Sequence, residues 1–148
     1  KMKNDDDVKS VLEDDGLPSE SLDSFHQYEN ITTVNLEDLR DQLGMGSWAV
    51  RIAYNELFGG VVIQQQPGEG NRKHFHPDAD ENWVILAGEW EWWIEGLGTQ
   101  RVKKHDIIVV PKGVPHHIKC VGATPGVRYA ITRPDVNHVY PDVEQNEH

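Results

Sequence analysis

From residue 47 onward, apolar and polar residues alternate in short runs that are typical of β-strands. In 81–87, for example, Trp83, Ile85 and Ala87 share one face because side chains alternate along a strand. Glycine, proline and aspartate separate the runs and mark turns. The predicted strands are 47–54, 58–66, 72–76, 81–87, 89–95, 99–103, 107–110, 115–121 and 127–132. Many short strands with closely spaced turns, and no helices between them, predict an all-β fold: an antiparallel sandwich or barrel.

One short helix is predicted ahead of the strands, over residues 35–43. Asn35 is a good N-cap, Leu36, Leu39 and Leu43 share a face, and Gly44 is a suitable C-terminal stop. We therefore divide the chain into a flexible acidic arm (1–30), a single barrel with its preceding helix (31–134) and a polar C-terminal tail (135–148).

The distribution of charge along the chain limits which kinds of molecule the protein is expected to bind. The chain of 148 residues has a net charge of -11, and residues 1–44 hold 12 of the 25 acidic residues but only 4 of the 14 basic ones. A nucleic-acid partner would need a clustered positive surface, so we expect none. No apolar run approaches the roughly 18 residues of a membrane span, and no signal segment is recognisable, so we expect a cytoplasmic protein without a membrane partner. A single cysteine excludes an internal disulfide framework.

The candidate chemistry lies in the stretch 68–88. His74 and His76 are one residue apart, so on a strand they point to the same side. Glu81 follows across a Pro-Asp turn and begins the next predicted strand. His116 begins another strand 40 residues after His76. Imidazole and carboxylate are the usual ligands of zinc, iron, manganese, nickel and copper, so these four residues are candidate metal ligands.

These residues resemble the motifs of the cupin superfamily, in particular its small single-domain members of the Cupin_2 type. The first motif (a glycine, an H-x-H pair, a glutamate and a second glycine) is matched by Gly68, His74, His76, Glu81 and Gly88. The second is matched by Pro111, Gly113 and His116, but His105 replaces its usual glycine and Cys120 its usual asparagine.

The resemblance covers about residues 47–133 and carries several expectations. It implies a jelly-roll (double-stranded β-helix) barrel, one divalent transition metal per chain held by His74, His76, Glu81 and His116, and a homodimer. We expect iron first, with manganese, nickel, zinc or copper as alternatives.

The pocket walls are less well defined by the sequence. Gln64, Gln66 and Tyr129 are catalytic candidates, because a polar side chain that faces the metal could orient water or move a proton. Trp83 and Arg128 are candidates for substrate binding, Trp83 as an aromatic wall and Arg128 as a two-pronged anion donor. Trp90 and Trp92 are better explained as packing in the core or at a dimer interface.

Two classes of function are consistent with these residues. The first is a metal-dependent enzyme, an oxygenase or a lyase, that acts on a small polar molecule. Three histidines and one carboxylate leave positions open on a five- or six-coordinate metal for water, dioxygen or substrate. The second is a non-catalytic module that binds or senses a metal or a small ligand. Metal content, turnover and ligand-induced thermal shifts would separate the two.

Overall fold

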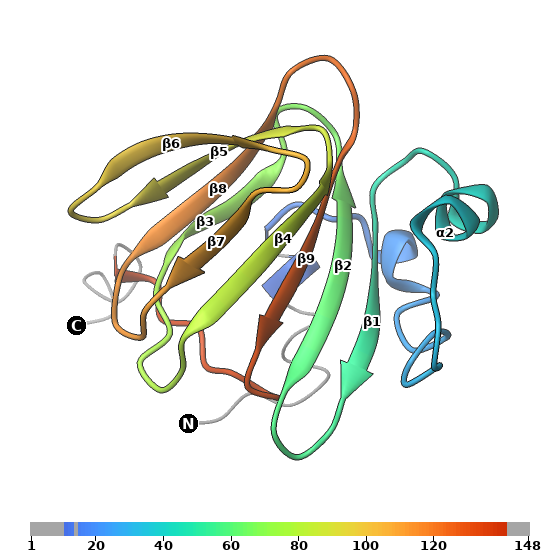
Figure 1. The fold of residues 1–148 in the computed structure, drawn as a ribbon, viewed down its shortest axis with the longest axis horizontal. Helices are drawn as coiled ribbons and strands as arrows, with labels where there is room; N and C mark the ends of the chain where they lie inside the picture. Colours follow the sequence, from blue (N-terminus) through green and yellow to red (C-terminus); the bar gives the residue numbers. More distant parts are fainter. Residues whose placement is uncertain (1–10, 14, 142–148) are drawn as a thin grey trace.

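The computed structural model describes residues 11–13 and 15–141, and its architecture is two facing antiparallel sheets (Figure 1). The larger sheet contains, in spatial order, β1 (Trp48–Tyr54), β2 (Gly59–Gln65), β9 (Gly126–Thr132), β4 (Glu81–Ala87) and β7 (Ile107–Val110). The smaller contains β3 (Gly70–His74), β8 (His116–Val121), β5 (Glu89–Ile94) and β6 (Gly98–Lys103). The prediction of an all-β jelly roll with a short helix is confirmed. None of the helices in the described part of the chain has the length and apolar character needed to cross a membrane.

The core between the two sheets is built around three tryptophans. Trp83 on β4 meets Trp92 on β5 edge to face at 5.2 Å between ring centroids, and Trp92 meets Trp90 at 6.0 Å. All three rings are almost inaccessible to solvent. Such aromatic pairs bury large apolar areas and prefer this T-shaped geometry. The sequence-based interpretation of Trp90 and Trp92 as core packing thus agrees with their burial.

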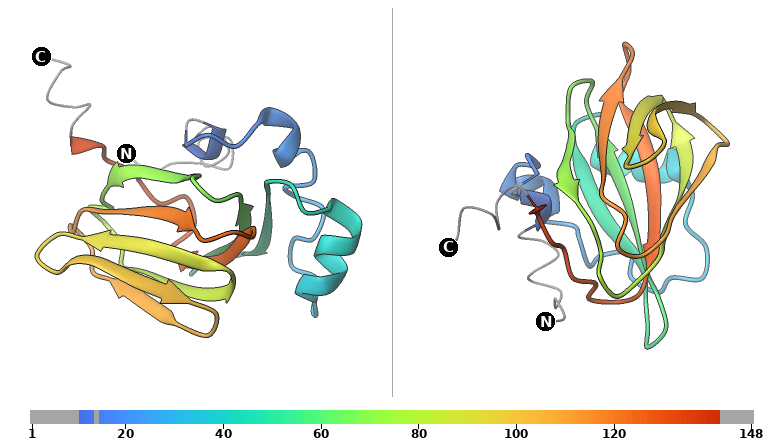
Figure 2. Two further views of the ribbon diagram at one scale, coloured as in Figure 1. Left: turned by 90° about the horizontal axis from the view of Figure 1, so that it is seen from above. Right: turned by 90° about the vertical axis from the view of Figure 1, so that its left-hand side faces the viewer.

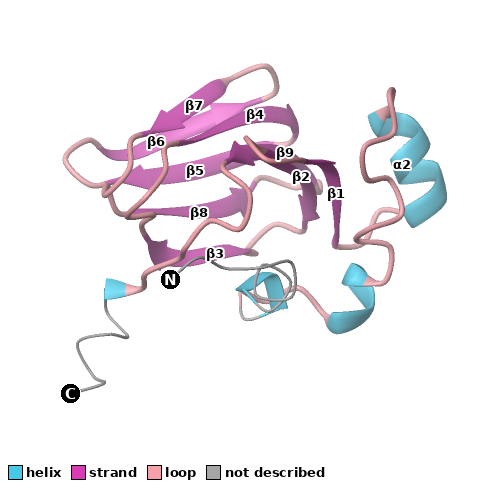
Figure 3. Ribbon diagram, turned by 90° about the horizontal axis from the view of Figure 1, so that it is seen from below, coloured by secondary structure: helices cyan, strands magenta, loops and turns pink. Residues whose placement is uncertain are grey.

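The helix α2 (Leu36–Leu43) covers the outer face of the larger sheet, beyond β1 (Figure 3). The side chain of Asn35 accepts hydrogen bonds from the backbone N–H groups of Glu37 and Asp38 at 2.8 and 3.2 Å, as expected of an N-cap. Leu39 is buried against Trp48 and other outward-facing side chains of β1, β2 and β9. Every second residue of these strands therefore points away from the interior.

The segment before α2 differs from the flexible acidic arm predicted over residues 1–30. Residues 1–10 lie outside the described part of the chain. Leu12, Leu17, Leu22 and Phe25 are buried against the inward-facing side of β1 and β2, and η1 (Ser19–Leu22) forms part of this segment (Figure 2). The apolar residues are too widely spaced to show a helical or strand period, but together they close one end of the barrel.

The candidate metal ligands lie at one end of the barrel because of the way β3 ends. The predicted strand 72–76 stops at His74, which pairs directly with His116 at the start of β8. Phe75 then forms a two-way backbone bridge with Val139, at 3.0 Å in each direction. This bridge keeps the chain extended through His76, so the alternation that places both histidines on one side continues beyond the sheet.

Candidate metal centre

Four buried side chains converge where β3, β4 and β8 meet. His74 ends β3, His116 begins β8, Glu81 begins β4, and His76 lies in the link between β3 and β4. Each offers one ligand atom, and these atoms all lie within 4.8 Å of one another. The set predicted from spacing is therefore assembled by the fold, and the four residues could hold a metal ion.

Backbone carbonyls orient the three imidazole rings. The Nδ1 atoms of His74, His76 and His116 lie 2.7, 2.7 and 3.0 Å from the carbonyl oxygens of residues 72, 137 and 114. A carbonyl only accepts, so each Nδ1 carries a proton and donates it. The tautomer is thereby assigned, and each Nε2 is left with a lone pair that points toward the cluster.

The inner atoms of the cluster lack protein partners. Among the described residues, Nε2 of His76, Nε2 of His116 and Oε1 of Glu81 are buried and form no hydrogen bond. Nε2 of His76 lies 2.7 Å from Oε1 of Glu81, and Nε2 of His116 lies 3.8 Å from the same oxygen. Two acceptors at 2.7 Å repel each other unless a proton or a cation lies between them. The donor set therefore fits a divalent transition metal.

The electrostatics of the cluster agree with this fit. Burial lowers the pKa of His74 and of His116, so both imidazoles are neutral and able to ligate. Burial alone would raise the pKa of Glu81, but the neighbouring His76 outweighs it and leaves that pKa lowered. In the same way burial would lower the pKa of His76, but Glu81 outweighs it. Either a proton or a metal ion between these two side chains would satisfy both, and the two compete for the same place.

The cluster opens into a cavity of about 90 Å³. Glu81 and His74 contribute to its polar part, with Asn71, Arg128 and His138. Its apolar part comes from two sources: strand residues of the barrel and the segments that flank the barrel in sequence. The apolar lining consists of Val11, Leu12, Val61, Ile63, Ala130 and Val136. The site is thus a small cavity with a metal-type donor set in its wall.

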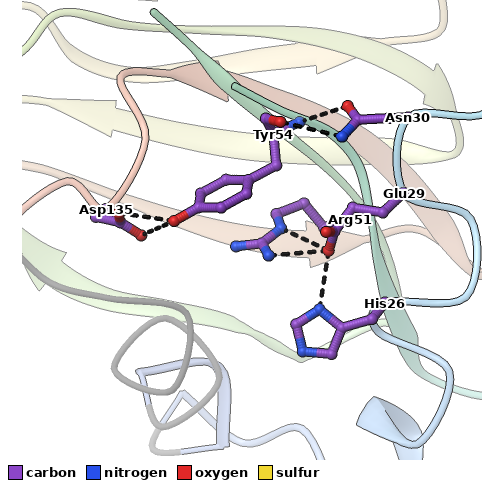
Figure 4. A network of polar contacts seen from close by, with 6 residues as sticks. All are labelled: His26, Glu29, Asn30, Arg51, Tyr54 and Asp135. Carbon is purple, nitrogen blue, oxygen red and sulfur yellow. Dashed lines mark hydrogen bonds and ion pairs between the residues drawn. The ribbon is translucent and has the colours of Figure 1, made fainter. Parts of the chain in front are cut away.

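A polar network forms the wall of this cavity next to β1 (Figure 4). Arg51 donates from Nε and Nη2 to one carboxylate oxygen of Glu29, at 3.0 and 2.9 Å. The hydroxyl of Tyr54 donates to Asp135 at 2.8 Å, and Asn30 bonds the backbone of Tyr54 on both sides. The network ties the N-terminal segment and the loop after β9 to β1, and it pairs the charge of Arg51 within the protein.

The three catalytic candidates named from the sequence lie outside the cavity, which is a correction. Gln64 points toward α2, where it accepts from Arg40 at 2.8 Å and donates to the carbonyls of Gly44 and Gly46. Gln66 donates to the carbonyl of Met45. Tyr129 packs on the outer face of the sheet with the cluster around Leu39, because it pairs with the outward-facing Val62.

The two substrate-binding candidates differ in position. Trp83 is fully enclosed in the core, where its ring lies 5.3 Å from that of His116, so it supports a candidate ligand and does not line the cavity. Arg128 points inward from β9 and lines the cavity together with Glu81. Only Arg128 of this pair is therefore placed to touch a substrate.

Sequence reasoning missed two inward-facing residues, Gln65 and His138. Gln65 accepts a hydrogen bond from Arg128 at 3.0 Å and donates to the carbonyl of Gly70. The His138 ring lies 4.6 Å from that of His76 and 5.2 Å from that of His74, and its buried Nδ1 forms no hydrogen bond with the described residues. Burial lowers the pKa of His138 to about 3. The alternation of Val136, His138 and Tyr140 was the available signal.

Comparison with known proteins identifies the class of this barrel. Residues 61–132 match the family model described as a cupin domain. No curated protein sequence matches the chain significantly. The matched residues run from β2 to β9 and include all four candidate ligands. The barrel from β2 to β9 therefore matches a cupin domain over these residues, in agreement with the two motifs.

Solved structures share the fold at low sequence identity. The protein TT1209 from Thermus thermophilus is 19% identical, with 70% of this chain and 98% of that chain covered and a TM-score of 0.60. The DMSP lyase DddQ from Ruegeria pomeroyi is 25% identical, with 64% and 51% covered and a TM-score of 0.55. The oxalate decarboxylase from Lactobacillus farciminis is 16% identical, with 63% and 29% covered and a TM-score of 0.56.

Proposed function

We propose that this protein is a metal-dependent enzyme, of the lyase or oxygenase type, that acts on a small polar molecule. The observation that carries the proposal is the convergence of three oriented imidazoles and one carboxylate beside a cavity. The similarity to the lyase DddQ supports the lyase alternative. The expected cytoplasmic location and homodimer stay predictions.

In this proposal the metal-binding residues and the residues of the cavity lining have separate roles. His74, His76, Glu81 and His116 would hold one divalent transition metal. When bound, such an ion supplies Lewis-acid polarisation of a substrate oxygen or, if it is redox-active, electron transfer. The apolar lining excludes bulk water and so strengthens the electrostatic interactions inside the cavity. We propose iron first; manganese, nickel, zinc and copper fit the same donors.

The first test is the metal content of protein purified without chelator, measured by mass spectrometry. We expect about one transition-metal ion per chain. His76→Ala should lose most of it, because the variant removes one of four ligands. The matched control is His117→Ala: His117 neighbours His116 on β8 but points outward and stacks on Trp93 at 5.2 Å. Metal retention in His76→Ala, or loss in His117→Ala, would contradict the site.

The second test concerns catalysis. The metal-loaded protein should turn over members of a panel of small acids, diketones and catechols, followed by oxygen uptake for oxygenases and by product analysis for lyases. His76→Ala should abolish this turnover and His117→Ala should keep it. A metal-loaded protein that shows ligand-induced thermal shifts but no turnover would instead be a binding module.

A further inference from the structure

Arg128 is a buried cation in the wall of the cavity. It lies on the inner face of β9, opposite Ile63 of β2 and Ile85 of β4, and only 3% of its surface is exposed. Burying a charge is costly unless the charge is paired. Burial lowers its pKa to about 10, so the guanidinium still carries its charge at neutral pH. The charge of Arg128 therefore requires a partner in the protein or in the cavity.

The direct contacts of Arg128 are with neutral groups, while the charges of Glu81 and Asp15 act on it from beyond ion-pair distance. Its Nη2 donates to the amide oxygen of Gln65 at 3.0 Å, and its guanidinium carbon lies 5.4 Å from the centroid of the Trp90 ring. Its Nε is buried without a hydrogen-bond partner among the described residues. Within residues 11–13 and 15–141, no carboxylate lies at ion-pair distance from it. The N–H group at Nε of Arg128 is thus a buried donor without a partner among these residues.

The other arginines near the site have carboxylate partners. Arg51 lies 2.9 Å from Glu29, and Arg133 lies 3.2 Å from Asp78. Arg72 lies 3.5 Å from the buried Asp15, so the negative charge of Asp15 is also paired. Glu81 is the remaining acid of the cavity lining near the cluster, and under the proposed function it ligates the metal. Among the described residues, Arg128 is therefore the arginine of the cavity lining that has no carboxylate at ion-pair distance.

We propose that Arg128, positioned by Gln65, binds the carboxylate of a small monocarboxylate substrate with a short apolar body. A carboxylate matches the planar fork of a guanidinium. Val61, Ile63 and Ala130 would contact the apolar body. The part of the proposal that places the reacting end of this molecule at the metal rests on the proposed function; the anion site itself does not.

The test compares straight-chain carboxylates, from acetate to hexanoate, with their uncharged amides by calorimetric titration of the metal-loaded protein. At least one carboxylate should bind roughly tenfold or more tightly than its amide, because a buried charge-assisted hydrogen bond has no equivalent with the amide. Equal binding of every pair, or no binding of any carboxylate, overturns the proposal. Tighter binding of inorganic phosphate than of all carboxylates overturns the carboxylate assignment.

Two variants test whether Arg128 causes the preference for a carboxylate over its amide. Arg128→Gln should abolish it. Gln65→Glu should do the same by a different route, because it places a carboxylate on the guanidinium and neutralises it without removing the buried arginine. Arg101→Gln, a surface control with the same change in net charge, should keep the preference; Arg101 is exposed and paired with Glu89 on the neighbouring strand. Retention of the preference in folded Gln65→Glu and Arg128→Gln proteins overturns the assignment to Arg128.

Measuring metal content and repeating the titrations after chelation and dialysis separates this proposal from the proposed function. Arg128 is not a candidate ligand, so the preference for the carboxylate should persist in the metal-free protein. If the protein is purified without metal but still prefers carboxylates, the proposed metal-dependent enzyme is refuted and the proposed anion site at Arg128 is supported. Metal-loaded protein without the preference would refute the anion site alone.

Discussion

At the scale of single residues, the site is defined by which atom of each side chain is already engaged. His74, His76 and His116 each give one nitrogen to a backbone carbonyl and keep the other for the cluster. Arg128 gives one nitrogen to Gln65 and keeps another buried and unused. These unused atoms, more than the residue types, indicate what the site can bind.

Asp15 gives a residue-scale prediction with a defined sign. Burial raises its pKa from 3.8 to about 6, so the folded state holds this proton more tightly than the unfolded chain. Its ionisation therefore destabilises the fold; the cost is absent below pH 3.8 and complete above pH 6. Asp15→Asn should raise the free energy of unfolding at pH 7 by about 3 kcal/mol.

Urea unfolding of both proteins from pH 4 to pH 7 checks this prediction. The gain in stability of Asp15→Asn should be small at pH 4 and should grow through the interval. A gain that does not change with pH would assign the effect to packing, and a net loss at pH 7 would show that the ion pair with Arg72 outweighs the burial cost.

The role of a residue could be predicted from the sequence where a motif marks its position. The four candidate ligands belong to two motifs, and strand alternation alone predicts that His74 and His76 lie on one side. The run Gln64, Gln65 and Gln66 offers no such marker, because a shift of one residue exchanges the two faces of a strand. The register of β2 with β9 places Gln65 inside and Gln64 outside. His138 was missed because the pairing of Val139 with Phe75 joins segments far apart in the sequence.

At the scale of elements, the short bridge between Phe75 and Val139 has an effect beyond its two hydrogen bonds. It holds the segment after β9 across the end of the barrel and so brings the carbonyl of Asn137 to His76. The segment also contributes Val136 and His138 to the cavity. It therefore acts as part of the site, whereas residues 135–148 were expected to form a polar tail.

Val139→Pro should weaken metal binding. Proline removes the N–H that bonds the carbonyl of Phe75, so the segment and its carbonyl at Asn137 should move away from His76. Loss of such an orienting partner typically costs roughly 10- to 100-fold in metal affinity. Competition with a chelator of known affinity measures the change, and Val139→Ala, which keeps the N–H, is the control. Equal affinities in the two variants would show that the bridge does not orient the ligand.

At the scale of the whole molecule, the barrel keeps several titratable groups neutral in its interior. Burial lowers the pKa values of His74, His116 and His138, so the folded state binds fewer protons than the unfolded chain below pH 6.5. The stability that depends on them is complete above pH 6.5 and is lost as the pH falls toward the lowered values. His76, whose pKa is raised, opposes this trend.

We therefore expect the chelated protein to lose stability on acidification. Its urea midpoint should fall between pH 7 and pH 5, because the three histidines with lowered pKa values outweigh His76 and Asp15, which act in the other direction. A bound metal should steepen the dependence, since protons compete with it for the same nitrogens. Replacing His138 with phenylalanine should flatten the curve of the chelated protein. A midpoint that rises on acidification would contradict this account.

The cavity is closed partly by Val11, Leu12 and Asp15 and partly by Val136 and His138, all of which lie outside the strands that carry the candidate ligands. The four candidate ligands and this part of the cavity wall are thus encoded in separate stretches of the gene. A lineage can exchange or lengthen the flanking stretches, and so change which molecule fits, without disturbing the four donors. This modularity also offers a route for engineering: grafting other flanks onto residues 48–132 would change the shape of the cavity beside the four donors.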